Sequence, residues 1–160
     1  MTLPFNEMPA NSRIWIYQSD RKLNDSELDQ IKLKLTDFLK NWTAHGDDLK
    51  SSFQIRYDRF IIIALNEKSA KASGCSIDAC VHFVQQIEKD YNINLLDKMN
   101  VAFKQGEYVS YKSIVEFKSL IKNNSVSKNT IVFNNLVLDI GDYKNNWEVP
   151  AYKSWHSRFF

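Results

Sequence analysis

The sequence predicts a single-domain α+β protein, because candidate hairpins are mixed with helical crossovers along the chain. Three amphipathic segments at helical spacing and several short β-branched and aromatic runs support this prediction. With 160 residues, of which 44% are hydrophobic, the chain is long enough to bury one core. We expect residues 1–160 to form a mainly antiparallel or mixed sheet of about five to six strands, with three main helices packed largely on one side.

Hydrophobic periodicity sets the order of the predicted elements. The continuous apolar run 60–65 predicts a strand buried on both faces. Residues 58–59, just before it, allow either a tight turn or one long bent strand. In chain order we expect a strand at 13–17, a helix from an Asn24 cap to a stop at Gly46, strands at 53–57 and 60–65, a helix at 76–91, strands at 101–104 and 108–112, a helix from a Ser113 cap to 123–124, a strand at 130–133 and a short helix within 139–147.

Local signals at the ends of elements support this order. Asn24 with Glu27, and Ser113 with Glu116, have the spacing of a helix N-cap and the acidic residue that completes it. Gly106 lies between two strand-like runs and predicts a hairpin turn. Both helix starts and the hairpin therefore follow from short-range chemistry.

The glycines exclude several enzyme classes. Only four are present, at 46, 74, 106 and 141. The Walker phosphate loop, the dinucleotide-binding fingerprint and the nucleophile elbow of α/β-hydrolases each need closely spaced glycines that this chain lacks. We expect no ATPase, dehydrogenase or α/β-hydrolase activity, and we expect binding rather than catalysis.

The segment Ala72-Ser73-Gly74-Cys75-Ser76-Ile77-Asp78 is the strongest candidate site, because small residues connect a buried strand to the start of a helix. The first N–H groups of a helix lack partners within the helix and can bind an anion. A capped, tightly packed turn is the simpler structural interpretation. His45 is most simply a C-terminal helix cap, but it could extend the site. The candidate ligand-binding or anion-binding residues are Ser73, Gly74, Cys75, Ser76, Asp78, His82 and His45.

The thiols allow one alternative function. Cys75 at a helix start could act as the nucleophile of a cofactor-free thiol enzyme. Cys80 lies on the apolar stripe of the same helix and is expected in the core, so we predict two free thiols. Asp78 and His82 are four residues apart and are expected to form a surface pair. Together with Cys75 they could hold zinc, but no metal-binding motif is present, and we expect neither a metal nor another cofactor.

The tail 147–160 contains five aromatic residues. We expect it to pack back onto the domain. A homodimer or partner contact is one alternative, and stacking on single-stranded nucleic acid is another. Because the net charge is only +2, we do not expect a nucleic-acid partner. No segment has the length and apolarity of a membrane span or a signal peptide, so we expect a cytoplasmic location and a small ligand or a protein as partner.

Four motifs give the chain a resemblance to a known family. These motifs are Trp42-Thr43-Ala44-His45-Gly46, the segment 72–78, Phe103-Lys104-Gln105-Gly106-Glu107 and Trp155-His156-Ser157-Arg158-Phe159-Phe160. In this order they resemble a group of small uncharacterised bacterial proteins that carry the automatic label "ABC transporter ATPase". The resemblance spans nearly the whole chain and implies a bacterial origin, but it brings no catalytic residues. ATP hydrolysis is not expected, because the chain lacks the Walker and signature loops of that activity.

Overall fold

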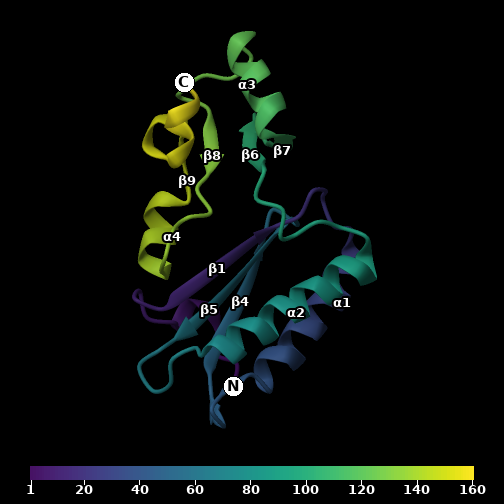
Figure 1. Ribbon diagram of the computed structural model, residues 1–160, viewed down its shortest axis with the longest axis vertical. Helices are drawn as coiled ribbons and strands as arrows, with labels where there is room; N and C mark the ends of the chain where they lie inside the picture. Colours follow the sequence, from purple (N-terminus) through teal and green to yellow (C-terminus); the bar gives the residue numbers. More distant parts are fainter. The chain divides into compact units, whose positions relative to one another are not determined.

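The computed structural model describes residues 1–160 and confirms the α+β class (Figure 1). Its contacts divide the chain into two compact units. The N-terminal unit contains Met1–Leu96 and Leu138–Ile140, and the C-terminal unit contains Asp97–Val137 and Gly141–Phe160. All pairs between the named strands are antiparallel, but the strands lie in sheets of three, two and four rather than in one sheet of five to six.

The N-terminal unit contains a three-stranded sheet in the order β1-β5-β4. Helices α1 and α2 lie side by side on one face of this sheet (Figure 1). A short hairpin, β2 with β3, follows α1. The bounds are η1 Phe5–Glu7, β1 Arg13–Gln18, α1 Asp25–Lys40, β2 Thr43–Ala44, β3 Asp47–Asp48, β4 Lys50–Arg56, β5 Phe60–Asn66 and α2 Gly74–Tyr91.

Both edges of this sheet are partly occupied by other backbone of the same unit. The Leu3 N–H donates to Ser51 O of β4 at 2.9 Å, and the Ile14 N–H of β1 donates to Leu138 O at 3.2 Å. A strand edge that already has backbone partners cannot add another strand at that point. A further strand therefore cannot pair with the sheet at Ser51 or at Ile14.

The predicted strand 60–65 is confirmed as the central strand, and each of its residues is 2% exposed or less. The residues before it form a tight turn rather than a bent strand. Tyr57 and Asp58 both have positive φ angles, of 54° and 52°, and the Arg59 N–H donates to Arg56 O at 3.1 Å. The sequence left the turn and the bent strand open at residues 58–59, because neither Asp58 nor Arg59 is glycine or asparagine.

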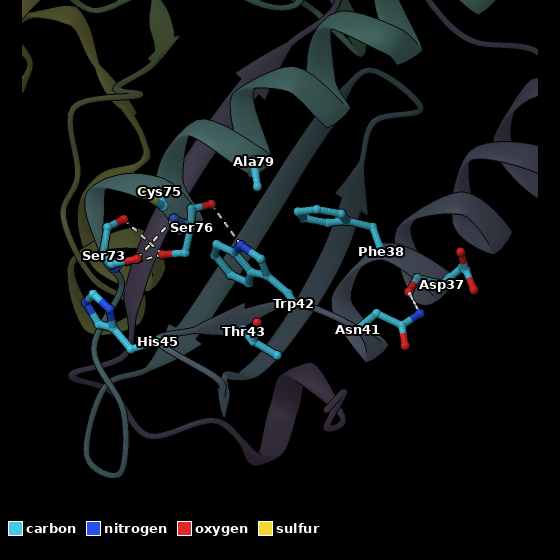
Figure 2. A pocket seen from close by; sticks show the side chains of 10 residues that line it. All are labelled: Asp37, Phe38, Asn41, Trp42, Thr43, His45, Ser73, Cys75, Ser76 and Ala79. Atoms are coloured by element: carbon cyan, nitrogen blue, oxygen red, sulfur yellow. Dashed lines mark hydrogen bonds between the residues drawn. The ribbon is translucent and has the colours of Figure 1, made fainter.

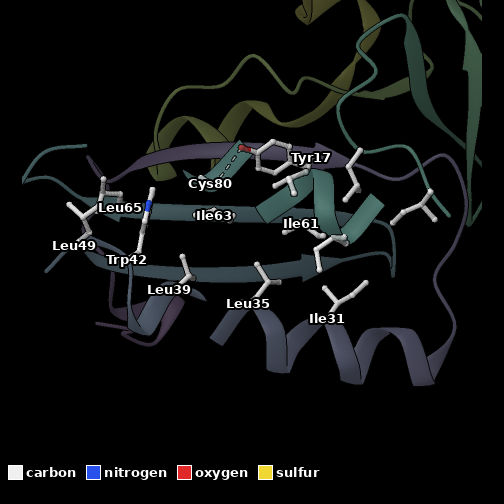
Figure 3. Close-up of a cluster of buried hydrophobic side chains, with 14 of the residues drawn as sticks. Tyr17, Ile31, Leu35, Leu39, Trp42, Leu49, Ile61, Ile63, Leu65 and Cys80 are labelled. Carbon is white, nitrogen blue, oxygen red and sulfur yellow. Dashed lines mark hydrogen bonds between the residues drawn. The ribbon is translucent and has the colours of Figure 1, made fainter. Parts of the chain in front are cut away.

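Side chains from the sheet and from both helices form the core of the N-terminal unit (Figure 3). Ile61, Ile63 and Leu65 project from β5 toward Leu35 and Leu39 of α1. Cys80 of α2 joins this core and is 3% exposed, as its position on the apolar stripe predicts. Helices on one face of this sheet thus match the expected packing.

The C-terminal unit contains a four-stranded sheet in the order β7-β6-β8-β9. Phe117 of α3 packs into its core with Phe103 of β6, at a ring distance of 5.3 Å. The hairpin turn at Gly106 and the Ser113 cap are confirmed. The bounds are β6 Asn100–Gln105, β7 Tyr108–Ser113, α3 Ile114–Lys122, β8 Ile131–Phe133, α4 Ile140–Asn146, β9 Glu148–Pro150, η2 Ala151–Lys153 and η3 Trp155–Phe159.

The aromatic tail contributes to the core of the C-terminal unit. Its first residues form β9, a strand the sequence did not predict, which pairs with β8. Ala151 is fully buried, and the ring of Phe159 lies 6.2 Å from that of Phe117. Tyr152 and Phe160 remain 51% and 43% exposed.

No helix is both long and apolar enough to cross a bilayer.

Candidate functional site

The start of α2 is held by reciprocal hydrogen bonds between Ser73 and Ser76. Ser73 is the N-cap, and its Oγ accepts the Ser76 N–H at 3.1 Å. In return, Ser76 Oγ accepts the Ser73 N–H at 2.7 Å. A serine thus takes the place of the usual acidic residue of this capping arrangement. None of the residues in the first turn is acidic, but the Glu67 carboxylate accepts the Ala72 N–H at 2.9 Å, one residue before the cap.

Two backbone donors at this helix start are free. The Ser76 and Ile77 N–H groups are bonded to Ser73, through its Oγ and its carbonyl oxygen. The N–H groups of Gly74 and Cys75 have no hydrogen-bond partner, and both residues are exposed. The sequence suggested a longer run of free amides, but the capping serine and the helix itself occupy the later ones.

A pocket with a volume of about 470 Å³ opens beside this helix start (Figure 2). Its wall comes from three separate segments: the end of α1, the hairpin strand β2 with its turn, and the first turns of α2. Figure 2 shows Ser73, Cys75 and His45 at one end and Asp37 and Asn41 at the other, with two aromatic rings between them. The lining residues are Asp37, Phe38, Asn41, Trp42, Thr43, His45, Ser73, Cys75, Ser76 and Ala79.

Trp42 joins the two ends of the pocket. Its indole N–H donates to Ser76 O at 2.8 Å, which ties the segment after α1 to the first turn of α2. The ring is 3% exposed and packs edge-on against Trp15, with centroids 6.0 Å apart. Phe38, which lines the pocket, stacks on Phe83 of α2 with ring centroids 4.5 Å apart. These contacts hold the aromatic wall in a fixed position.

His45 is not a helix cap, which corrects the structural role predicted for it. Helix α1 ends at Lys40, and His45 with Gly46 forms the two-residue turn of the β2–β3 hairpin. Both residues have positive φ angles, of 52° and 83°. A two-residue hairpin turn requires this backbone conformation. The turn places the imidazole on the pocket wall, so His45 lies with the start of α2, although the two are nearly 30 residues apart in sequence.

The other predicted site residues take no direct part in the pocket wall. Gly74 lies between two lining residues, Ser73 and Cys75. Asp78 and His82 are exposed on α2 outside the wall, and no hydrogen bond or ion pair joins them. No group of three or more metal-binding side chains is gathered in the chain.

Sequence reasoning missed six of the ten residues that line the pocket. Phe38 and Trp42 continue the apolar spacing of the first predicted helix, and this spacing alone gives no sign that they line a pocket. Asp37 and Asn41 lie in no motif, and Thr43 lies in one only through the family resemblance, which brought no site residues. The signal that could have found them is the abrupt end of helical spacing before His45-Gly46, which places this segment at a chain reversal.

The two cysteines have different environments, and both are free thiols as predicted. Cys75 is exposed on the pocket wall. Burial raises the pKa of the Cys80 thiol to about 11, and the Tyr17 hydroxyl lies 3.9 Å from its sulfur. A thiol in such a setting stays protonated at neutral pH and is inert. Cys75 is therefore the thiol that a ligand in the pocket can reach.

Comparison with protein-family models, curated proteins and solved structures found no match. The geometry of the pocket and the chemistry of its wall are therefore the basis of the functional proposal.

Proposed function

We propose that the protein binds a small organic anion, a carboxylate or a phosphate monoester, in the pocket at the start of α2. The observation that carries this proposal is the combination of an open pocket and two unpaired backbone N–H groups, those of Gly74 and Cys75, at the end of an 18-residue helix. The pocket volume lies within the usual range for small-molecule sites. Unpaired N–H groups and the helix dipole together favour an anion at this end.

The rest of the wall suggests the shape of the ligand. Phe38, which is partly exposed, offers apolar surface for a flat body next to the anionic group. Asp37 and Asn41 lie at the far end, where a carboxylate and an amide suit a hydroxyl or amine donor of the ligand. An anion with a planar apolar body and a polar far end fits this order of groups.

Proline at position 74 provides a sharp test. Proline lacks the N–H and is well tolerated at the first position of a helix. Ser73 already has the extended backbone, φ −102° and ψ 168°, that a residue before proline adopts. No atom lies within 4 Å of a Cβ added at Gly74. The variant Gly74→Pro therefore removes the N–H of residue 74 and keeps the helix. The variant Gly74→Ala keeps this N–H, that of Cys75 and the helix.

Phenyl phosphate is the probe, and its binding is followed by amide chemical shifts in an NMR titration. We expect the Cys75 amide to shift on titration and Gly74→Pro to weaken binding about tenfold, the value of roughly one charge-assisted hydrogen bond. Gly74→Ala should bind as the native chain does. Equal binding by all three chains, or shifts confined to residues outside the pocket wall, would contradict the proposal.

A thiol enzyme is the second candidate, because Cys75 and His45 line the same pocket. An adjacent base is the usual way to activate a nucleophilic thiol. The test is the pH dependence of iodoacetamide alkylation in the native chain and in His45→Gln. Activation predicts fast alkylation near neutral pH that slows in the variant, whereas identical profiles near that of an ordinary cysteine would remove this candidate. The homodimer through the aromatic tail stays a prediction.

A further inference from the structure

The two units of the chain have net charges of opposite sign, and these partly cancel in the small net charge of the whole chain. The N-terminal unit carries twelve lysine and arginine residues against fourteen acidic ones, a net charge of −2. The C-terminal unit carries nine against five, a net charge of +4. The charge of +2 for the chain is the sum of these opposed values. Charge asymmetry between parts of a chain points to a polyanionic partner for the basic part.

Most cations of the C-terminal unit have no carboxylate partner. Lys104 pairs with Glu148, and Lys112 with Glu116. The other seven form no ion pair. In the N-terminal unit, four of the twelve cations form ion pairs within that unit, and its acidic residues outnumber its basic ones. A cation without an internal partner contributes its full charge to an incoming anion.

Five of these seven cations gather at one end of the C-terminal unit, on α3, the loop after it and the two C-terminal 3-10 helices. Lys118 Nζ and Arg158 Cζ lie 5.4 and 5.9 Å from the centre of the same Phe159 ring. The Lys128 carbonyl accepts the Tyr152 N–H at 2.9 Å, which places the loop against η2. Figure 1 shows α3 beside the C-terminus. The five cations, all exposed, are Lys118, Lys122, Lys128, Lys153 and Arg158, and we call them the basic end.

Aromatic rings lie between these cations. Tyr152 and Phe160 are about half exposed, and the Arg158 guanidinium lies 5.1 Å from the centre of the Trp155 ring. The loop adds exposed amide and hydroxyl side chains from Asn123, Asn124, Ser125, Ser127 and Asn129. We propose that the basic end binds single-stranded nucleic acid, with phosphates on the lysines and bases against the exposed rings. Unpaired bases present flat faces to such rings, which the stacked bases of a duplex do not.

A protein surface of this kind could also attract an anionic membrane, but its rings favour the nucleic acid. Phe160 lies edge-on to Phe117 at 6.2 Å, and the Lys153 ammonium lies 5.8 Å from the centre of the Tyr152 ring. The rings are thus held within the basic surface. A membrane-inserting surface presents projecting aliphatic and aromatic side chains on an amphipathic face.

Fluorescence anisotropy of a labelled oligouridylate of about 15 nucleotides tests the proposal with the full chain. We expect binding at about 50 mM salt that weakens steeply as salt increases. The triple variant Lys118→Gln, Lys153→Gln, Arg158→Gln should bind at least tenfold more weakly, with a salt slope smaller by about two units. The charge-matched control carries Lys32→Gln, Lys40→Gln and Lys68→Gln in the N-terminal unit and should bind as the native chain does.

Tyr152→Ala separates base stacking from charge without changing any cation. This variant should weaken oligouridylate binding while leaving the binding of inorganic polyphosphate unchanged. The proposal is overturned if the oligonucleotide is not bound at low salt, or if the control loses as much affinity as the triple variant. Tighter binding of a duplex of equal charge, or of vesicles with anionic lipid, would also overturn it. Gly74→Pro should leave all these results unchanged, so this proposal and the pocket proposal can fail separately.

Discussion

His156 is expected to make the C-terminal unit sensitive to acid. The residue is 1% exposed, its Nδ1 lies 2.7 Å from Ser154 Oγ, and its ring stacks on Trp155 at 3.9 Å. Burial, and then the nearby positive charge of Arg158, lower the pKa of the imidazole from 6.5 to about 4. The folded protein therefore holds this side chain neutral at pH values where an unfolded chain would protonate it.

The sign and size of the effect follow from this difference in pKa. Because the pKa is lower in the folded state, the stabilisation is complete above about pH 6.5 and is lost as the pH falls toward 4. This difference in pKa lowers the free energy of unfolding by about 3 kcal/mol once the pH is below both pKa values, and by about 2 kcal/mol at pH 5. The unfolding free energy should fall by this amount in acid, in addition to the contributions of all other titrating groups.

The contribution of His156 to the free energy of unfolding can be measured by urea unfolding. Tryptophan fluorescence follows the unfolding of the native chain and of His156→Asn. Asparagine keeps a polar atom near the position of Nδ1 but does not titrate. It lowers stability at every pH, so the quantity of interest is the difference between the two chains. That difference should shrink by about 2 kcal/mol between about pH 7.5 and pH 5, because the other titrating groups cancel.

A difference for His156→Asn that does not change with pH would refute the reasoning. An NMR titration of the His156 ring with a midpoint near 6.5 would refute it as well.

Three further outcomes follow from contacts within the N-terminal unit. Arg21 donates two hydrogen bonds, of 2.8 and 2.7 Å, to the Glu27 carboxylate and lowers its pKa to about 2. Glu27→Gln should therefore lower the free energy of unfolding in urea by about 1 kcal/mol near pH 7, and this loss should vanish as the pH falls from 4.5 toward 2. Trp42→Phe removes the bond to Ser76 O, and calorimetry should show a loss of about 1–2 kcal/mol together with weaker phenyl phosphate binding. Mass spectrometry after a brief maleimide pulse at neutral pH should find Cys75 labelled and Cys80 labelled only in denaturant.

The elements that short-range chemistry specifies were predicted well. The Asn24 and Ser113 caps, the Gly106 turn and the buried strand 60–65 are all present. The first helix was extended too far, because Trp42 continues its apolar spacing although its backbone has left the helix. Strand β9 was missed because its three residues pair only with β8, far away in sequence, and show no period of their own.

The candidate site was predicted on one side only. The start of α2 has a local signature, since a capping residue and small side chains at a strand–helix junction are visible in sequence. The opposite wall has none, because Asp37, Asn41 and Thr43 are ordinary polar residues that gain meaning only from their neighbours in space. His45 was noted for the wrong reason, since its left-handed backbone conformation belongs to a hairpin turn.

The sequence by itself determined the class of fold, the helix starts and the absence of nucleotide-binding glycine motifs, because each depends on residues within a few positions of one another. Only the tertiary structure decided which helix N–H groups stay unpaired, which thiol is reachable, and that three distant segments enclose one pocket. It also showed that opposite charges belong to different units. These properties depend on packing between residues far apart in the chain, which no local pattern records.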